Sequence, residues 1–134
     1  MTLMSTKIEK MVKAARDARR RALAPYSGFK VGAAIRTESG VIYSGCNVEN
    51  ATLGLTVCAE RVALFKALSE GARRFTDVAV VTAAERPTPP CGACRQLLWE
   101  YCGDVPVHLA STRGRRKSFT LGELLPYAFD KRDL

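Results

Sequence analysis

A chain of 134 residues is long enough for one compact domain with a hydrophobic core, and its 47% apolar and 25% charged content is ordinary for a globular protein. No apolar run approaches the ~18–20 residues of a membrane span and no signal-peptide pattern opens the chain, so we expect a single cytoplasmic domain over residues 1–134 with no membrane partner. The net charge of +8 raises the question of nucleic acid. No aromatic residue is interleaved with the arginine clusters at 19–21 and 113–117, as a single-strand binding surface would need, so we predict solvated surface and no nucleic-acid partner.

The first part of the chain reads as a helix followed by a hairpin. We predict a helix over residues 5–22 capped by Ser5 or Thr6, strands over 29–36 and 41–46, and a turn at 38–40. Asn47-Val48-Glu49-Asn50 then leaves the second strand as a polar loop. These side chains either meet a ligand or hydrogen-bond within their own turn, and the pattern does not decide between the two.

The rest of the chain alternates helices and strands. We predict helices over 58–70 and 91–101, strands over 75–83 and 105–110, a basic loop over 111–117, a short strand at 118–120 and a helical turn over 121–125. The continuous apolar run at 78–81 indicates a strand covered on both faces. This element order predicts an α/β protein, a three-layer α/β/α sandwich around a mixed five-stranded sheet.

Three of the five cysteines have the spacing of a metal site. Cys58 is followed two residues later by Glu60, and Cys91 and Cys94 form a Cys-x-x-Cys pair, each half opening a predicted helix. Zinc with three protein ligands keeps a fourth position open for water, which is typical of catalytic sites, and a carboxylate beside it can carry protons. Taken alone, the pair also fits a redox motif or part of a structural zinc site, whose fourth ligand would have to be Cys102 or His108.

Two arginines are predicted to offset the negative charge of the three thiolates. Helix N-termini favour the thiolate form that binds zinc, and three thiolates leave a zinc site with a formal charge of −1. Arg61 and Arg95 directly follow Glu60 and Cys94, so either could donate hydrogen bonds to the sulfurs. Cys46 and Cys102 are expected to be small, partly buried apolar side chains.

Taken together, the motifs resemble the zinc-dependent cytidine deaminases of the short, homotetrameric family with three cysteine ligands. The matching stretches are Pro25-Tyr26-Ser27, Phe29, Val31-Gly32-Ala33-Ala34, Asn47-Val48-Glu49-Asn50-Ala51, Cys58-Ala59-Glu60-Arg61, Pro90-Cys91-Gly92-Ala93-Cys94-Arg95-Gln96, Leu124-Leu125-Pro126 and Phe129. The resemblance covers nearly the whole chain. One departure is Leu53, where family members commonly carry an aromatic residue near the subunit contact.

The resemblance implies a role for each matched residue. It implies that Cys58, Cys91 and Cys94 hold one Zn²⁺ per chain, that Glu60 carries protons, and that Arg61 offsets the negative charge of the thiolates. For the nucleoside, it implies that Asn47, Val48 and Glu49 form the ribose-binding stretch, that Phe29 packs on the pyrimidine, and that the backbone around Ala59 binds the base. It further implies that Phe129 reaches the active site of a neighbouring subunit. It also implies a homotetramer with shared active sites.

The implied activity is hydrolytic deamination of cytidine and 2′-deoxycytidine to the corresponding uridines with release of ammonia, as in pyrimidine salvage. Such an enzyme is a hydrolase acting on a cyclic amidine C–N bond. The alternatives are a deaminase of another cytosine nucleoside such as blasticidin S, a polynucleotide cytosine deaminase, and a non-catalytic zinc module.

Overall fold

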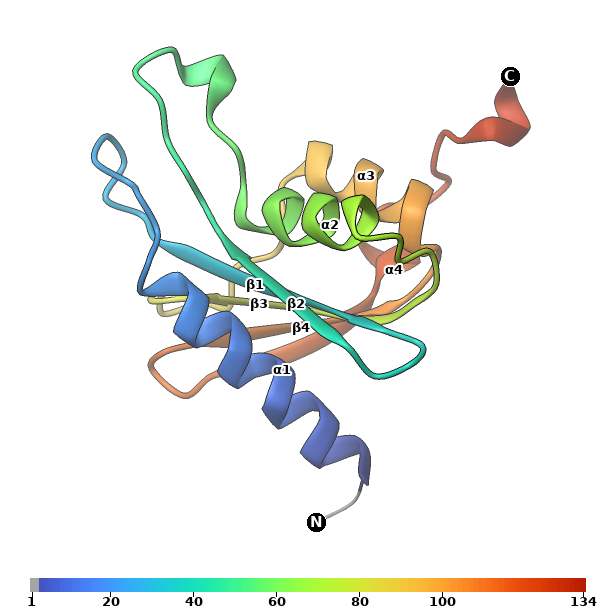
Figure 1. Cartoon of the computed structure of the whole chain (residues 1–134), viewed down its shortest axis with the longest axis horizontal. Helices are drawn as coiled ribbons and strands as arrows, with labels where there is room; N and C mark the ends of the chain where they lie inside the picture. The colour runs from blue at the N-terminus through green and yellow to red at the C-terminus, as the bar shows by residue number, and fades with distance from the viewer. Residues whose placement is uncertain (1–2) are drawn as a thin grey trace.

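A five-stranded sheet with the order β2-β1-β3-β4-β5 runs through the centre of the molecule, as a computed structural model shows (Figure 1). The structure describes residues 3–134, with side chains from residue 6 onward. The strands are β1 (Val31–Thr37), β2 (Ile42–Cys46), β3 (Phe75–Thr82), β4 (Pro106–Ser111) and β5 (Arg116–Thr120). The helices are α1 (Leu3–Arg19), α2 (Ala59–Ser69), α3 (Gly92–Cys102) and α4 (Leu121–Leu124), with short 3₁₀ turns at Leu53–Leu55 and Lys131–Asp133.

The sheet is mixed, as predicted. Strands β3 and β4 are parallel, joined by the crossover through α3, and the other neighbouring pairs are antiparallel. The apolar run of β3 is buried on both faces. Along β4, Val107 and Leu109 point to one core while Ala110 points to the other, as the two-residue period of a strand requires.

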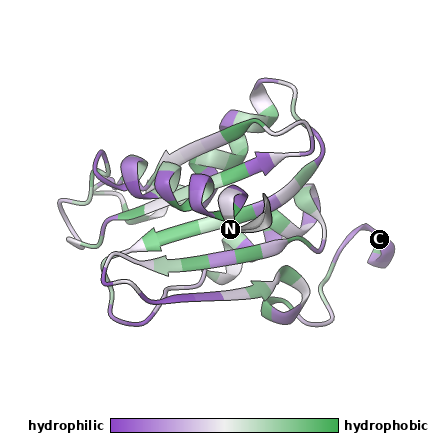
Figure 2. Cartoon of the chain, turned by 90° about the horizontal axis from the view of Figure 1, so that it is seen from below, coloured by the Kyte–Doolittle hydropathy of each residue, from purple (hydrophilic) through white to green (hydrophobic). Residues whose placement is uncertain are grey.

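The predicted three-layer sandwich is confirmed. Helix α1 covers one face of the sheet with Met11, Val12 and Ala15 packed on Ala79 and Val81. Helices α2 and α3 cover the other face, where Leu64, Leu98 and Leu109 are among the fully buried side chains. Figure 2 views the sheet from the α1 side and shows hydrophobic residues concentrated on its central strands.

Two glycines let these helices lie directly on the sheet. A Cβ built on Gly45 of β2 would lie 2.7 Å from the backbone nitrogen of Ala63 in α2, and one on Gly32 of β1 would lie 1.8 Å from the carbonyl oxygen of Ala15 in α1. Both neighbours are backbone atoms and cannot move aside alone. A side chain at Gly45 would therefore push α2 off the sheet and displace Cys58 at the N-terminus of that helix.

Several predicted boundaries are wrong by a few residues. Helix α1 begins at Leu3, so Ser5 and Thr6 lie inside it, and it ends at Arg19 instead of residue 22. Strand β1 begins at Val31, which leaves Phe29 in the preceding loop. Strand β4 ends at Ser111 and β5 begins at Arg116, so the predicted basic loop is shorter by three residues. The turn at 38–40 is confirmed, with Gly40 at φ 98°.

Within residues 3–134, none of the helices combines the length and apolar character needed to cross a membrane.

Candidate zinc centre and active site

The sheet topology brings the metal-site segments to one edge. Strands β2 and β3 both run antiparallel to β1, so their carboxyl ends lie beside the start of β1. Chain leaving β2 leads to α2, and chain leaving β3 leads to α3, so both helices begin at this edge (Figure 1).

The three sulfurs of the predicted metal site lie together. Cys58 is the N-cap of α2, Cys91 is the N-cap of α3, and Cys94 lies one turn into α3. Their Sγ atoms all lie within 4.8 Å of one another, and this is the one such metal-binding group found among the described residues. Sulfurs that are each ~2.3 Å from a tetrahedral zinc ion lie ~3.8 Å apart, so the cluster is suited to binding one zinc.

Arg61 shows that the site is built to hold negative charge. Its pKa is raised, first by hydrogen bonding to Cys94 and then by attraction to Cys94 and Cys58. Its Nε atom is buried and has no hydrogen-bond partner in the described part of the chain. A half-buried guanidinium beside the thiols fits a site whose thiols are ionised by a metal, because it offsets the excess negative charge.

The thiols are unequal in the metal-free chain. A hydrogen bond from Cys94, followed by the positive charge of Arg61, lowers the pKa of Cys58 to about 6. The same hydrogen bond and burial raise the pKa of Cys94. Cys58 is therefore the first to be ionised and ready for a metal, and Cys94 must release its proton when the metal binds.

Glu60 lies in the first turn of α2 and is 5% exposed. Burial raises the pKa of its carboxyl to about 7, with the Cys58 thiolate adding to the rise and Arg61 opposing it. A carboxyl that is half protonated near neutral pH can both accept and donate a proton.

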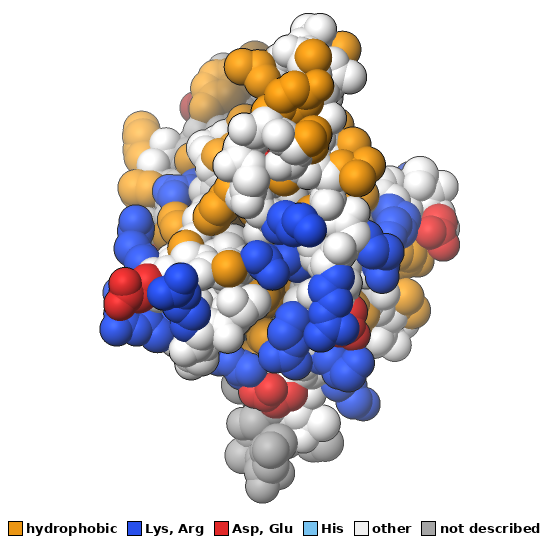
Figure 3. Space-filling view, turned by 90° about the vertical axis from the view of Figure 1, so that its left-hand side faces the viewer, with side chains coloured by type: hydrophobic (Ala, Val, Ile, Leu, Met, Phe, Trp, Pro, Cys, Tyr) orange, Lys and Arg blue, Asp and Glu red, His pale blue; other side chains and the backbone are white. Residues whose placement is uncertain are grey.

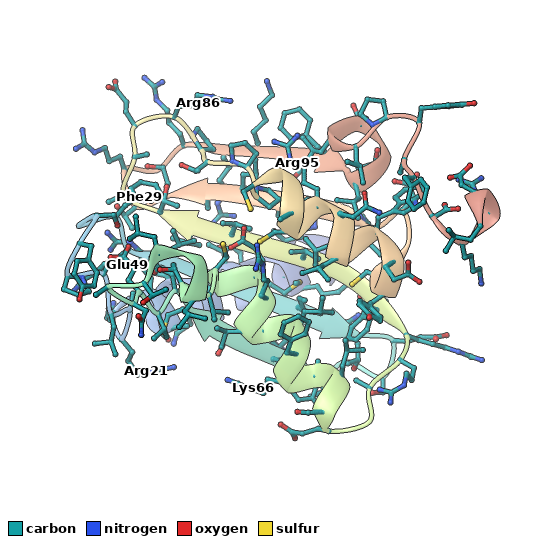
Figure 4. All side chains as sticks on the ribbon, turned by 90° about the horizontal axis from the view of Figure 1, so that it is seen from above. Arg21, Phe29, Glu49, Lys66, Arg86 and Arg95 are labelled. Carbon is teal, nitrogen blue, oxygen red and sulfur yellow. The ribbon has the colours of Figure 1, made fainter. Side chains whose placement is uncertain are left out.

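A cavity of about 300 Å³ opens at this edge of the sheet. It is lined by Ser27, Phe29, Val31, Asn47, Glu49, Thr56, Cys58, Ala59, Glu60, Val80, Thr88, Pro89 and Cys91. Seven of the predicted site residues therefore share one cavity, with Cys94 and Arg61 beside it. Figure 4 shows Phe29 and Glu49 at the end of the molecule where α2 and α3 begin.

Glu49 is held by the turn that precedes β1. Its Oε1 accepts hydrogen bonds from the backbone nitrogens of Tyr26 at 2.9 Å and Ser27 at 3.0 Å, and its Oε2 accepts one from the Ser27 hydroxyl. These bonds lower the pKa of Glu49, the Ser27 hydroxyl contributing most. The carboxylate is thus ionised and fixed at the cavity wall.

Asn47 bonds to the backbone on either side of Lys30, not within its own turn. Its Oδ1 accepts from the Val31 nitrogen at 2.9 Å and its Nδ2 donates to the Phe29 oxygen at 2.8 Å. One N–H and one lone pair of the amide remain for a ligand. Asn47 therefore fixes the segment that carries Phe29 and also lines the cavity.

Two further residues with an implied role do not line this cavity: Val48, from the ribose-binding stretch, and Phe129, from the subunit contact. The backbone of Val48 pairs with Val57. Phe129 lies in the C-terminal tail and is 60% exposed. Its carbonyl oxygen accepts a hydrogen bond from Gln96 of α3 at 2.6 Å.

Arg95 does not hydrogen-bond to the sulfurs, so that half of the prediction is wrong. Its Nε donates to the Pro90 oxygen and its Nη1 to the Leu124 oxygen, both at 2.7 Å. Arg95 therefore ties the loop before Cys91 to the C-terminal part of the chain. The sequence order does not reveal this role, because Leu124 lies 29 residues further along the chain.

Neither proposed fourth ligand joins the metal site. His108 lies on the α1 face of the sheet, where its Nε2 bonds to Asp77 and its Nδ1 to Ser118, both at 2.8 Å. Cys102 is eight residues beyond Cys94, at the far end of α3, and burial raises the pKa of its thiol to about 12. A closed four-ligand site is therefore not assembled by the described residues.

The cavity also contains polar residues that were not singled out from the sequence. Ser27, Thr56 and Thr88 line it. Ser27 lies within the Pro25-Tyr26-Ser27 stretch, but its contact with Glu49 spans 22 residues and no local pattern indicates it. Thr88 lies in the proline-rich loop, and its hydroxyl hydrogen-bonds to Thr82 at 3.0 Å.

Comparison with known proteins agrees with this site. Residues 5–109 match the model of the cytidine and deoxycytidylate deaminase zinc-binding region. A cytidine deaminase of Sporosarcina psychrophila is 49% identical over 128 residues, covering 95% of this chain and 94% of the relative. The crystal structure of cytidine deaminase from Burkholderia pseudomallei is similar with a TM-score of 0.88 at 46% identity, covering 96% of this chain and 100% of that one. A blasticidin-S deaminase of Bacillus cereus is 38% identical over 109 residues, covering 75% of this chain and 77% of the relative.

Proposed function

The chain belongs to the family of zinc-binding cytidine and deoxycytidylate deaminases, and on that premise we propose that it catalyses the hydrolytic deamination of cytidine and 2′-deoxycytidine. The reaction adds water at C4 of the cytosine ring, breaks the C4–N4 bond and releases ammonia. The observation that carries this proposal is the buried carboxyl of Glu60 beside three clustered thiols at the wall of a 300 Å³ cavity.

Cys58, Cys91 and Cys94 would hold the zinc ion. A zinc ion bound there supplies a Lewis acid that makes water nucleophilic at neutral pH. Glu60 takes one proton from the attacking water and delivers it to N3 of the base. It then takes the second proton of that water, from the hydroxyl now on C4, and delivers it to the departing amine, which leaves as ammonia. Because its raised pKa lies near neutrality, the same carboxyl can accept and donate both protons in turn.

The remaining cavity residues bind the nucleoside. Phe29 packs against the pyrimidine ring, and the buried backbone at Ala59 reads its polar edge. Glu49 and the free hydrogen-bonding positions of Asn47 hold the ribose hydroxyls, and Val48 sets the course of the loop that carries both. The cavity is at the small end of the range for ligand sites, which suits a single nucleoside.

Turnover of small nucleosides and of polynucleotides separates the candidate functions. We expect release of ammonia from cytidine and 2′-deoxycytidine, slower or no turnover of blasticidin S, and no turnover of a short cytosine oligonucleotide. We also expect little change in cytidine KM between about 50 and 200 mM salt, since nucleoside binding neutralises no phosphates. Faster turnover of blasticidin S would favour the antibiotic deaminase. Salt-sensitive competition by the oligonucleotide would favour a polynucleotide substrate.

The exposed apolar side chains support a homotetramer. Leu23, Leu53 and Leu55 are each more than 60% exposed, and Figure 3 shows hydrophobic side chains gathered on the protruding part of the face it presents. Apolar patches of this kind mark protein–protein contacts. Phe129 is exposed and does not line its own chain's cavity, and we propose that in the assembly it completes the active site of a neighbouring subunit.

Mixed assemblies test these shared sites. Sedimentation should give the mass of four chains. Phe129→Ala should lower kcat/KM, and Glu60→Gln should abolish turnover. Subunits of the two variants mixed and reassembled should regain activity, because a Phe129→Ala chain keeps Glu60 and can receive Phe129 from its neighbour. Mixtures that remain as inactive as the separate variants would show that Phe129 does not act between subunits.

Two broader properties complete the proposal. The whole chain, residues 1–134, acts as one catalytic domain. All five cysteines are free in the structure, and a three-thiol site needs reduced cysteines, which supports a cytoplasmic location.

A further inference from the structure

The hydroxyl of Ser27 lies between two parts of the nucleoside site. It donates a hydrogen bond to Glu49 Oε2, and its oxygen accepts one from the backbone nitrogen of Phe29 at 3.0 Å. A hydroxyl has one proton to donate and lone pairs to accept with, and a carboxylate can only accept, so the direction of both bonds is fixed.

This arrangement leaves Glu49 little freedom. A carboxylate has about four acceptor positions, and the turn at Tyr26 and Ser27 fills three of them. An unrestrained glutamate side chain would populate several rotamers and would lose that freedom on binding a ligand. Ser27 removes part of this cost in advance, because its hydroxyl holds the second carboxylate oxygen while the backbone nitrogens hold the first.

The position of Phe29 depends on the same hydroxyl. The Phe29 nitrogen is held by Ser27 and its carbonyl oxygen by Asn47 at 2.8 Å. Phe29 and Glu49 lie at the same end of the molecule (Figure 4) and line the same cavity. One hydroxyl thus sets the spacing between the aromatic side chain and the carboxylate.

We propose that Ser27 is a positioning residue for nucleoside binding, whose hydroxyl aims Glu49 at a ribose hydroxyl in register with Phe29. The proposal rests on the proposed function, in which Glu49 binds the ribose. Ser27 acts before the chemical step and equally in the ground state and the transition state. Its removal should therefore raise KM and leave kcat unchanged.

Three variants with cytidine as substrate test this role. Ser27→Ala should raise KM roughly tenfold, the effect of losing one hydrogen bond to a charged group, while kcat stays within about twofold and zinc content is unchanged. Ser27→Thr keeps a hydroxyl and should recover most of the loss. Ser39→Ala, in the turn between β1 and β2 where Ser39 bonds to Thr37, is the matched control and should behave as wild type. An unchanged KM in Ser27→Ala, or no recovery in Ser27→Thr, would overturn the proposal.

A second comparison asks whether Ser27 acts through Glu49. We propose that Glu49 binds the 2′ or 3′ hydroxyl. The inhibition constant of 2′,3′-dideoxycytidine, which lacks both, should therefore be nearly the same for wild type and Ser27→Ala. Adding Ser27→Ala to Glu49→Gln should raise the KM for cytidine by much less than it does alone, because residues in one network are not additive. Full additivity would contradict action through Glu49. If Glu49→Gln alone left KM unchanged, the ribose assignment itself would fail, whatever Ser27→Ala does.

Discussion

Replacement of Cys91 or Cys94 by alanine should remove the metal from this protein and with it all turnover of cytidine. The wild-type protein should contain about one zinc per chain, because the three sulfurs lie within 4.8 Å of one another and Arg61 offsets their charge. With two thiols the site loses the coordination that zinc requires. Elemental analysis together with an ammonia-release assay measures both effects.

Loss of zinc should also destabilise the fold. Metal binding to a site that exists only in the folded chain adds to folding stability, by about 2.7 kcal/mol at a free metal concentration 100 times Kd. For a chain of this length that corresponds to roughly 10 °C in Tm. Treating the wild type with a chelator should produce the same fall, and re-adding zinc should reverse it.

Cys46→Ala is the matched control for these variants. Cys46 is a half-buried cysteine at the end of β2 and is not among the three clustered thiols. Its replacement should leave zinc content and activity unchanged. A wild-type protein that is active without zinc, or a Cys94→Ala protein that keeps its metal, would contradict the assignment of the site.

The metal site could be predicted from the sequence because its ligands depend on local structure. Cys58 and Cys91 are helix N-caps, and Cys94 follows Cys91 by one helical turn, so spacing alone places the thiols at two helix starts. The buried pattern of β3 then indicates the central strand between them. Local patterns do not show that the N-termini of α2 and α3 lie together. The strand order of the folded sheet brings them to the same edge.

Contacts between distant segments account for what the sequence did not predict. The sequence pattern predicts the start of β1 two residues too early. The reason is that the chain around Phe29 folds onto Glu49 and Asn47 through contacts that span 18 to 22 residues. The sequence pattern predicts part of strand β5 as a basic loop because its exposed positions carry Arg116 and Lys117. It is a strand because it pairs with β4, and Arg116 forms an ion pair with Glu9 of α1. A single sequence shows neither partner.

Glu60→Gln should retain the fold and the zinc ion and lose at least a hundredfold in kcat. The amide has nearly the same shape as the carboxyl, so the packing of the first turn of α2 is preserved. Burial raises the pKa of Glu60 to about 7 from an ordinary value of 4.5, which means that the folded protein already favours the uncharged form. In zinc-free protein the carboxyl therefore stabilises the fold less as pH rises from about 4.5 to about 7, and the amide variant should lack this part of the pH dependence.

Deamination, in contrast, requires a side chain that accepts and donates protons, which an amide does not do. Glutamine cannot accept a proton from water or deliver one to N3 and the amine, and a positioned acid–base group contributes ~10²–10⁴-fold. The loss should appear in kcat, with zinc content unchanged and product uridine bound as tightly as by wild type.

Glu70→Gln, at the exposed C-terminal end of the same helix, should keep full activity. If Glu60→Gln kept more than about a tenth of the wild-type kcat, another group would have to carry the protons, and no other carboxyl except Glu49 lines the described cavity. Because Glu49 is held ionised at the cavity wall by three hydrogen bonds, it is poorly suited to take that place.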